Sequence, residues 1–231
     1  MRPPDAAASL GFVDEELEVA KERGWREVAA IAAAYERGEL GDEGWHEAMA
    51  ALVVPAYLAA ETPEGGSGSS RDAAGWERAR SLVAEAVVPG QTFLDIGCAN
   101  GHLMESMRRW AGVEPYGLEI SPELAALARR RLPQWADRIW VGNASSWRSP
   151  QRFDVVRTGL DYVPAPHRRE LVEHTLSYCD RLVIGVFNEQ RADRALEREV
   201  VSWGYSVAGR AKREHTHPLL AYRTFWIDSA S

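Results

Sequence analysis

Two acidic residues and the small residues between them are the part of this sequence whose types and spacing could do chemistry. Asp95 stands near the end of a short apolar run, and Gly97, Ala99 and Gly101 follow it at alternate positions. Small or absent side chains let the chain turn tightly and let a ligand approach the backbone closely. The free N–H groups of a helix that begins after such a turn point at that ligand. We therefore predict a binding site for a polar ligand at this turn.

The second acid, Glu119, stands 18 positions after Gly101. In a doubly wound α/β fold, an acid at about this distance accepts hydrogen bonds from ribose hydroxyls. Because a carboxylate would repel a 2′-phosphate, we expect an adenosine compound that lacks one. The spacing of Gly97, Ala99 and Gly101 also differs from the G-x-G-x-x-G pattern of dinucleotide-binding enzymes, which argues against NAD.

From residue 91 onwards the sequence alternates between strand and helix patterns. Strands are expected at 91–97, 115–120, 138–142, 153–158 and 181–187, and near 206–214 and 220–228. Helices are expected at 102–111, 122–132, 166–178 and 191–203. This alternation predicts an α/β fold with a doubly wound, mostly parallel seven-stranded sheet. The last two strands have no helix between them, so we expect an antiparallel pair at one edge, with an antiparallel edge strand.

The N-terminal part differs, because it carries helical patterns and no strand pattern. We expect residues 1–61 to form an N-terminal helical appendage, a cap whose last helix is broken or kinked at Pro55. Residues 62–71 are rich in Gly and Ser and form either a linker or a loop that closes over a ligand. Residues 72–231 form the ligand-binding domain. The cap either covers core surface or shapes a substrate pocket, and both alternatives remain open.

The segment DIGCANG at residues 95–101 resembles motif I of the class I S-adenosylmethionine-dependent methyltransferases, with Ala99 where that family usually has a second glycine. Three later segments are similar to further family motifs: GLEIS at 117–121, VGNA at 141–144 and FDVVRTGLDYVP at 153–164. The resemblance covers about residues 72–228. It implies S-adenosylmethionine as the cofactor and S-adenosylhomocysteine as the product.

The resemblance also implies nine cofactor-binding residues: Asp95, Gly97, Ala99, Gly101, Glu119, Ile120, Asn143, Ala144 and Thr158. Asp95 would hold the ammonium of the cofactor's methionine part, and the Thr158 carbonyl would face the same amine. Glu119 would bind the ribose, with Ile120 against the adenine face. Asn143 and its neighbour Ala144 would meet the adenine edge, with asparagine in place of the commoner aspartate.

Methyl transfer is an in-line displacement, so the enzyme mainly aligns the reactants and excludes water. A base is needed only when the nucleophile carries a proton. Asp161, Tyr162 and His167, which follow the fourth expected strand, are the candidate catalytic residues, although each could have a structural role alone. No metal is expected, because His215 and His217 share one face of an expected strand without a third ligand beside them.

Charge and composition limit the partners. The net charge is −7, and residues 1–72 hold 15 acidic and 6 basic side chains. Such an acidic N-terminal part argues against duplex nucleic acid as a partner. The fourth expected strand also lacks the Asn/Asp-Pro-Pro-aromatic segment with which DNA amino-methyltransferases grip a flipped base. Two cysteines without a C-x-x-C spacing, no signal peptide and no long apolar run predict a cytoplasmic protein that does not enter a membrane.

The sequence therefore predicts a cytoplasmic S-adenosylmethionine-dependent methyltransferase that acts on a small-molecule acceptor, as a monomer or homodimer. The acceptor and the atom that is methylated remain open. One alternative is an RNA or protein methyltransferase, for which a basic cleft would be built from five arginines: Arg129, Arg130, Arg131, Arg168 and Arg169. We expect these arginines to lie on solvated helix faces instead, so RNA is not the expected partner. The other alternative is a binding module that keeps the cofactor and has lost catalysis.

Overall fold

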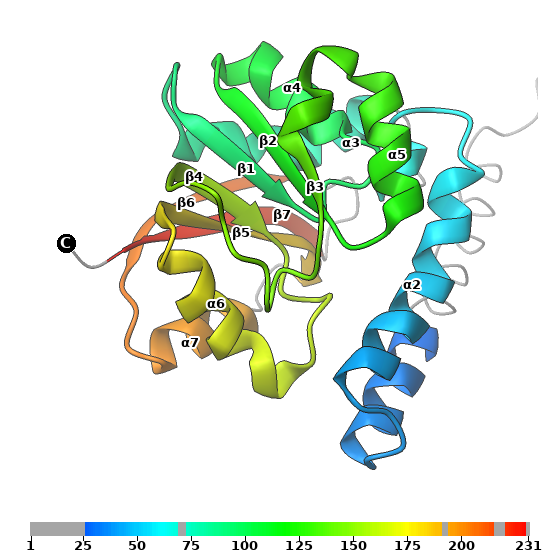
Figure 1. The fold of residues 1–231 in the computed structure, drawn as a ribbon. Helices are drawn as coiled ribbons and strands as arrows, with labels where there is room; N and C mark the ends of the chain where they lie inside the picture. The colour runs from blue at the N-terminus through cyan, green and yellow to red at the C-terminus, as the bar shows by residue number, and fades with distance from the viewer. Residues whose placement is uncertain (1–25, 69–72, 191–193, 215–219, 230–231) are drawn as a thin grey trace, which may run out of the picture. The chain divides into compact units, whose positions relative to one another are not determined.

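The computed structural model describes residues 26–68, 73–190, 194–214 and 220–229 (Figure 1). The chain divides into two compact units, Met1–Leu52 and Val53–Ser231. The first unit is helical where it is described, and helix α2 (Asp42–Leu58) runs across the boundary. The helical prediction is therefore confirmed for these residues. The helix is not broken at Pro55, because α2 continues to Leu58, and the alternative of a kink there stays a prediction. Pro55 lies in the last turn, where its missing N–H removes a hydrogen bond only near the helix end.

The second unit is built on one sheet of seven strands: β1 (Thr92–Ile96), β2 (Glu114–Glu119), β3 (Ile139–Val141), β4 (Phe153–Thr158), β5 (Cys179–Gln190), β6 (Val207–Glu214) and β7 (Leu220–Asp228). Their order is β3-β2-β1-β4-β5-β7-β6. The first five strands in this order pair in parallel. β7 runs antiparallel between β5 and the edge strand β6. The predicted fold class and the antiparallel pair at the edge are confirmed, and β7 is the antiparallel member.

Five helices flank the sheet: α3 (Ala73–Arg80), α4 (His102–Ala111), α5 (Pro122–Arg131), α6 (Arg168–Leu176) and α7 (Ala195–Ser202). Helices α3, α4 and α5 cover one face, and α6 and α7 cover the other (Figure 1). Short 3₁₀ turns lie at Gly65–Ser67, Ser81–Ala86, Pro133–Arg138 and Ala165–His167. Helix α5 begins as predicted, since the Ser121 hydroxyl accepts from Leu124 N and Pro122 opens the first turn.

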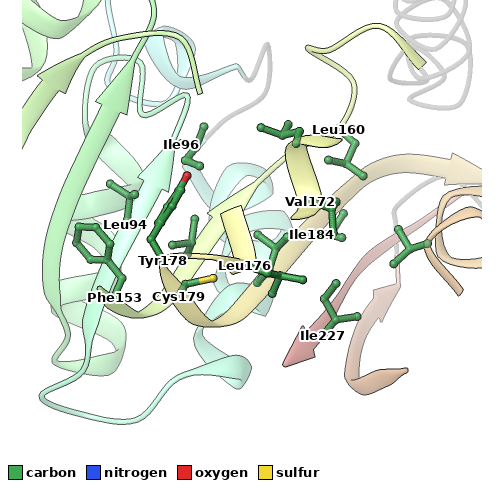
Figure 2. Packing of buried hydrophobic residues seen from close by; sticks show 14 of the residues in the cluster. Leu94, Ile96, Phe153, Leu160, Val172, Leu176, Tyr178, Cys179, Ile184 and Ile227 are labelled. Atoms are coloured by element: carbon green, nitrogen blue, oxygen red, sulfur yellow. The ribbon is translucent and has the colours of Figure 1, made fainter. Parts of the chain in front are cut away.

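Alternation along the central strands divides the core into two layers. Phe93 on β1 and Val155 on β4 pack with Trp76 of α3 on one face. On the other face Leu94 packs with Val172 of α6, in the cluster that Figure 2 shows from close by. Both layers come from strands buried on two sides, which is why these strands are continuous apolar runs in the sequence.

The strand order places a change of winding direction between β1 and β4. From β1 the chain winds outward through β2 and β3, then returns to β4 on the other side of β1. In open α/β sheets, ligands bind outside the carboxyl ends of the strands at such a point. The residues that follow β1, β2 and β4 therefore lie at the expected position of a site.

Aromatic rings cover the sheet where a helix is missing. Residues 142–152, between β3 and β4, form no helix. The rings of Tyr116 and Trp140 stack there, with their centroids 5.7 Å apart and their planes 4° apart. The ring centroid of Trp147 lies 5.4 Å from that of Trp140. These three side chains are partly buried against the core layer of α6. Because aromatic pairs add to the free energy of burial, we infer that they stabilise this edge of the sheet.

Replacing Trp140 with alanine should therefore lower the free energy of unfolding by about 2 kcal/mol, less than for a fully buried ring. The matched control is Val141→Ala on the same strand, because Val141 is 41% exposed. Urea unfolding monitored by circular dichroism measures both variants. Equal stability of the two variants would contradict a structural role for the ring stack.

Candidate active site

The turn between β1 and α4 has the backbone of a ligand-binding loop. Gly97, Ala99 and Gly101 have φ of 74°, 49° and 77°. A Cβ built on Gly97 would meet nothing within 4 Å, so the space beside this turn is open. A Cβ on Gly101 would come within 2.6 Å of the Leu132 side chain, so glycine lets the loop pack against the chain after α5. Among the described residues, Ala99 is the one non-glycine residue with positive φ.

Glu119, the last residue of β2, holds this loop through its carboxylate. Oε2 accepts a hydrogen bond from Ala99 N at 2.7 Å, and Oε1 accepts one from Ser121 N at 3.0 Å. The residue is 5% exposed. Burial raises the pKa of its carboxyl, while the backbone N–H groups of Ser121, Ala99 and Ile120 oppose that shift. A carboxylate offers about four acceptor positions, so each oxygen can accept a second hydrogen bond.

An apolar surface lies next to this acid in the sequence and at the same end of the sheet. Ile120 follows Glu119 directly and is 41% exposed. Val141, the residue paired with Glu119 in the sheet, is exposed to the same extent. A buried acceptor of hydrogen bonds beside exposed apolar side chains suits a ligand that carries both hydroxyls and a flat ring.

Asp95 lies at the end of β1 and is 2% exposed. Arg157 Nη1, from the paired position on β4, donates to Asp95 Oδ1 at 3.2 Å. Burial raises the pKa of Asp95 to about 6, and the Arg157 and Arg80 guanidiniums oppose the shift. Half of this carboxyl population is then ionised near pH 6, so the charge of Asp95 responds to small changes in its surroundings.

Two polar side chains that the sequence analysis missed, Tyr57 and Arg80, lie beside this pair together with the predicted Tyr162. Tyr57 near the end of α2 and Arg80 at the end of α3 approach each other, and Tyr162 is close enough to act on both of them. Burial and the Tyr162 phenol raise the pKa of Tyr57 above its usual range, so its hydroxyl stays protonated. Burial and the Arg157 charge lower the pKa of Arg80 to about 10, which leaves it cationic at neutral pH.

Arg157 carries the one sequence signal that could have pointed to this group. It is a charged residue, 9% exposed, and it directly follows the two buried valines Val155 and Val156 on a central strand. A buried arginine requires a carboxylate or other acceptors around it. Tyr57 and Arg80 have no comparable signal, because they lie on helices whose spatial neighbours the sequence pattern does not specify.

The predicted catalytic residues divide between two places. Asp161 and Tyr162 lie three and four positions after the end of β4, close enough to the arginines that Arg157 acts on Asp161 and Tyr162 acts on Arg80. Asp161 as a whole is exposed, but desolvation of its carboxyl raises its pKa, and the charges of Arg168 and Arg157 oppose the shift. His167 lies just before α6, where its Nδ1 is 3.0 Å from Glu170 Oε2.

The remaining predicted residues lie at the strand ends. Asn143 follows β3, and its side-chain oxygen accepts from Ser145 N at 3.0 Å within its own turn. Ala144 is partly buried against the core. Thr158 ends β4, is 3% exposed, and its hydroxyl donates to the Gly159 carbonyl at 3.1 Å. Their cofactor roles stay predictions.

The segment just before α3 packs against the ligand-binding turn. Asn100 Nδ2 donates to the Pro63 carbonyl at 2.7 Å, and Asn100 Oδ1 accepts from His102 N at 3.0 Å. His102 Nε2 lies 3.4 Å from Glu64 Oε1. The described residues of the predicted loop 62–71 therefore contact the turn that would hold a ligand, and Ser69 to Arg71 lie outside the described residues.

Two further expectations concern metals and membranes. In the part of the chain that the structure describes, no group of three or more His, Cys, Asp or Glu side chains could hold a metal ion. His215 and His217 lie outside the described residues. Over the same part of the chain, no helix combines the length and the apolar character that crossing a membrane requires.

The class I methyltransferase fold has a parallel sheet with this strand order, an inserted antiparallel strand and an acid at the end of β2. Residues 93–180 match the family model described as "Methyltransferase domain". Residues 93–180 therefore form a methyltransferase domain, in agreement with the resemblance to the class I S-adenosylmethionine-dependent methyltransferases. No curated protein matches the sequence.

Solved structures show the same fold at low sequence identity. Magnesium protoporphyrin IX methyltransferase from Synechocystis PCC 6803, with bound S-adenosylmethionine, is 18% identical with a TM-score of 0.52, over 71% of this chain and 87% of that one. A glycopeptide N-methyltransferase complexed with S-adenosylmethionine is 15% identical with a TM-score of 0.54, over 66% and 86%. A methyltransferase from Geobacter sulfurreducens in complex with S-adenosylhomocysteine is 15% identical with a TM-score of 0.52, over 77% and 98%.

The positive φ at Ala99 leads to a stability prediction. A left-handed backbone is unfavourable by about 1 kcal/mol for a residue with a Cβ, and more for a β-branched one. Ala99→Val should lower the free energy of unfolding by about 2 kcal/mol, because the site is also buried. Ala99→Gly should leave stability within about 0.5 kcal/mol of the original or raise it, since glycine relieves the strain but gains entropy when unfolded. Thermal and urea unfolding measure both, and a valine variant as stable as the original protein would contradict the observed backbone conformation.

Proposed function

We propose that the protein transfers the methyl group of S-adenosylmethionine to a small-molecule acceptor, with the cofactor bound by Asp95, the turn at 97–101 and Glu119. The observation that carries this proposal is the Glu119 carboxylate. It is bonded to the N–H of Ala99 in the turn and keeps acceptor positions on both oxygens. The ribose hydroxyls of an adenosyl group would fill these positions. The adenine would lie against Ile120, with Asn143 and Ala144 at its edge.

The methionine part of the cofactor would reach the end of β1 and β4. Asp95 would hold the ammonium, together with the carbonyl of Thr158. Gly97 would provide the room, because nothing lies within 4 Å of the position its Cβ would take. The donors and acceptors present at this end of the sheet therefore suit both charged and polar parts of the cofactor.

When bound, the cofactor would supply a methyl group on a positively charged sulfur. The lone pair of the acceptor would form a bond to the methyl carbon, and the sulfur would leave as a neutral thioether. The protein aligns the acceptor with that carbon and excludes water. For an acceptor that carries a proton, Asp161 and Tyr162 are the candidates for receiving it, because they follow β4 at the open end of the site. His167 remains a more distant candidate, because its described contact is with Glu170.

The arginines that could have formed an RNA-binding cleft support a small acceptor instead. Four of them bond to groups of their own chain. Arg129 donates to the Ile139 carbonyl, and Arg131 donates to the Asn100 carbonyl and pairs with Glu105. The other two pair with acids near α6 and α7: Arg168 with Glu199 and Arg169 with Glu173. Guanidiniums held in this way offer fewer donors to phosphates than a basic cleft requires.

Calorimetry with S-adenosylhomocysteine tests the cofactor assignment. We expect micromolar binding, and a loss of about tenfold in affinity for Glu119→Gln, because the amide can accept ribose hydrogen bonds on one atom only and carries no charge. Glu123→Gln is the control, because Glu123 is an exposed acid on α5. An unchanged affinity in Glu119→Gln would contradict the ribose assignment. Absence of binding by the original protein would contradict the proposed function.

The raised pKa of Asp95 predicts how cofactor affinity depends on pH. In the free site, the Asp95 carboxylate takes up a proton as the pH falls through about 6. Only the ionised carboxyl attracts the ammonium, so binding releases that proton, and affinity falls as the pH is lowered. We expect S-adenosylhomocysteine to bind about tenfold more weakly at pH 5 than at pH 7. Asp95→Asn should bind weakly at both values. A pH-independent affinity in the original protein would contradict the assigned role of Asp95.

Turnover separates an enzyme from a module that only binds the cofactor. The release of S-adenosylhomocysteine from S-adenosylmethionine in the presence of pooled amine, phenol, thiol and carboxylate acceptors measures it. We expect release above the background without acceptor. Binding without release for every pool would favour the non-catalytic alternative.

A further inference from the structure

We propose that Tyr57, Arg80 and Tyr162 form a binding site for a carboxylate group carried by the methyl acceptor. This inference rests on the proposed function and names the acceptor's chemical class. The three side chains come from α2, α3 and the segment after β4, so the fold brings them together from distant parts of the sequence.

The convergence of these donors is visible around Gly68. A Cβ built there would lie 2.6 Å from the Tyr57 hydroxyl and 3.4 Å from Arg80 Nη2. The phenol and the guanidinium therefore point to the same place beside the backbone of Gly68, whose φ of 83° also requires glycine. Tyr162 acts electrostatically on both Tyr57 and Arg80, so a second phenol lies near this group.

Tyr57, Arg80 and Tyr162 lie near the ends of β1 and β4, where the methionine part of the cofactor would bind. Arg80 interacts with Arg157 and Asp95, the pair that joins β1 to β4. Tyr162 is 54% exposed, so it borders the side that is open to solvent. An acceptor that enters after the cofactor would approach along Tyr162 and meet Tyr57 and Arg80 next.

The charges favour an anion at this position. The Arg157 charge acts on Arg80, and both guanidiniums act on the carboxyl of Asp95. Arg157 also acts on the carboxyl of Asp161. Tyr57 keeps its proton because of burial, so its hydroxyl is a donor or a neutral acceptor and adds no negative charge. Bound S-adenosylmethionine would add the positive charge of its sulfur, whereas in the complex with S-adenosylhomocysteine the guanidiniums alone would attract the anion. A carboxylate would be attracted by these positive charges and would match the planar fork of a guanidinium.

The first test uses a probe pair that differs only in charge. We measure the binding of 4-fluorobenzoate and 4-fluorobenzamide to the protein saturated with S-adenosylhomocysteine, by ¹⁹F NMR titration. The benzoate should bind at least tenfold more tightly than the benzamide. Arg80→Met should abolish this preference, and Arg78→Met should keep it, because Arg78 is an exposed arginine in the same last turn of α3.

A second, more conservative variant controls for the possibility that Arg80→Met unfolds the protein. Tyr57→Phe keeps the ring and removes the hydroxyl, so it should weaken benzoate binding severalfold while the melting temperature of the S-adenosylhomocysteine complex changes little. Equal binding of benzoate and benzamide by the original protein would overturn the proposal. A preference that persists in Arg80→Met would overturn it as well.

The cofactor's own carboxylate is the other source of the same chemistry, and a second probe pair distinguishes it. We compare S-adenosylhomocysteine with its decarboxylated analogue, in the original protein and in Arg80→Met. An acceptor site predicts that Arg80→Met changes the two affinities by the same small factor. A loss of tenfold or more for S-adenosylhomocysteine alone would assign Arg80 to the cofactor and overturn the acceptor site.

Failure of the proposed function would look different. In that case the original protein would not bind S-adenosylhomocysteine at all, whichever way the fluorinated probes behave with the free protein. Cofactor binding with no benzoate preference would leave the methyltransferase assignment intact and reject the carboxylate site alone.

Discussion

The hydrogen bond from Ala99 N to the Glu119 carboxylate is the interaction on which the site depends. It joins the turn after β1 to the end of β2 at 2.7 Å in a buried position. Ala99 holds a left-handed backbone there, which is unfavourable for a residue with a Cβ, and the bond to Glu119 helps to maintain it. One carboxylate therefore shapes the loop and presents acceptor positions to a ligand. Because of this double role, we expect an exchange of Glu119 for another polar residue to change both the loop and the ligand site.

A second constraint is the burial of several charges at the carboxyl ends of β1 and β4. Asp95 and Arg157 pair across neighbouring strands, and Arg80 approaches them from α3. Buried charges are unfavourable unless they are paired, so their retention at the mouth of a sheet is better explained by a role in binding than by stability. The aromatic stack at β2 and β3 provides stability at the other side, where residues 142–152 form no helix.

Much of the fold was predictable from the sequence, because each central strand is a short apolar run closed by glycine or a polar residue. The helix 102–111 and the strand 153–158 have the bounds that were predicted. The strand 181–187 is longer in the structure, Cys179–Gln190, because pairing with β7 continues beyond the apolar run. The predicted break of the helix at Pro55 was wrong, because local propensity does not show that this proline lies in the last turn of α2.

The site was predictable only in part. Asp95, Glu119 and the small residues between them follow a local pattern, and the structure brings them to one end of the sheet. Tyr57 and Arg80 could not be found in this way, because their importance comes from contacts with residues about 80 to 105 positions later. The aromatic stack was missed for the same reason, since it depends on the pairing of β2 with β3.

A crystal structure of the protein with S-adenosylhomocysteine is the most direct test of the central claim. The account predicts both ribose hydroxyls within hydrogen-bond distance of the Glu119 carboxylate, with the bond from Ala99 N still in place and the adenine against Ile120. A ribose bound elsewhere, or a Glu119 side chain that contacts only its own backbone neighbours in the complex, would contradict it.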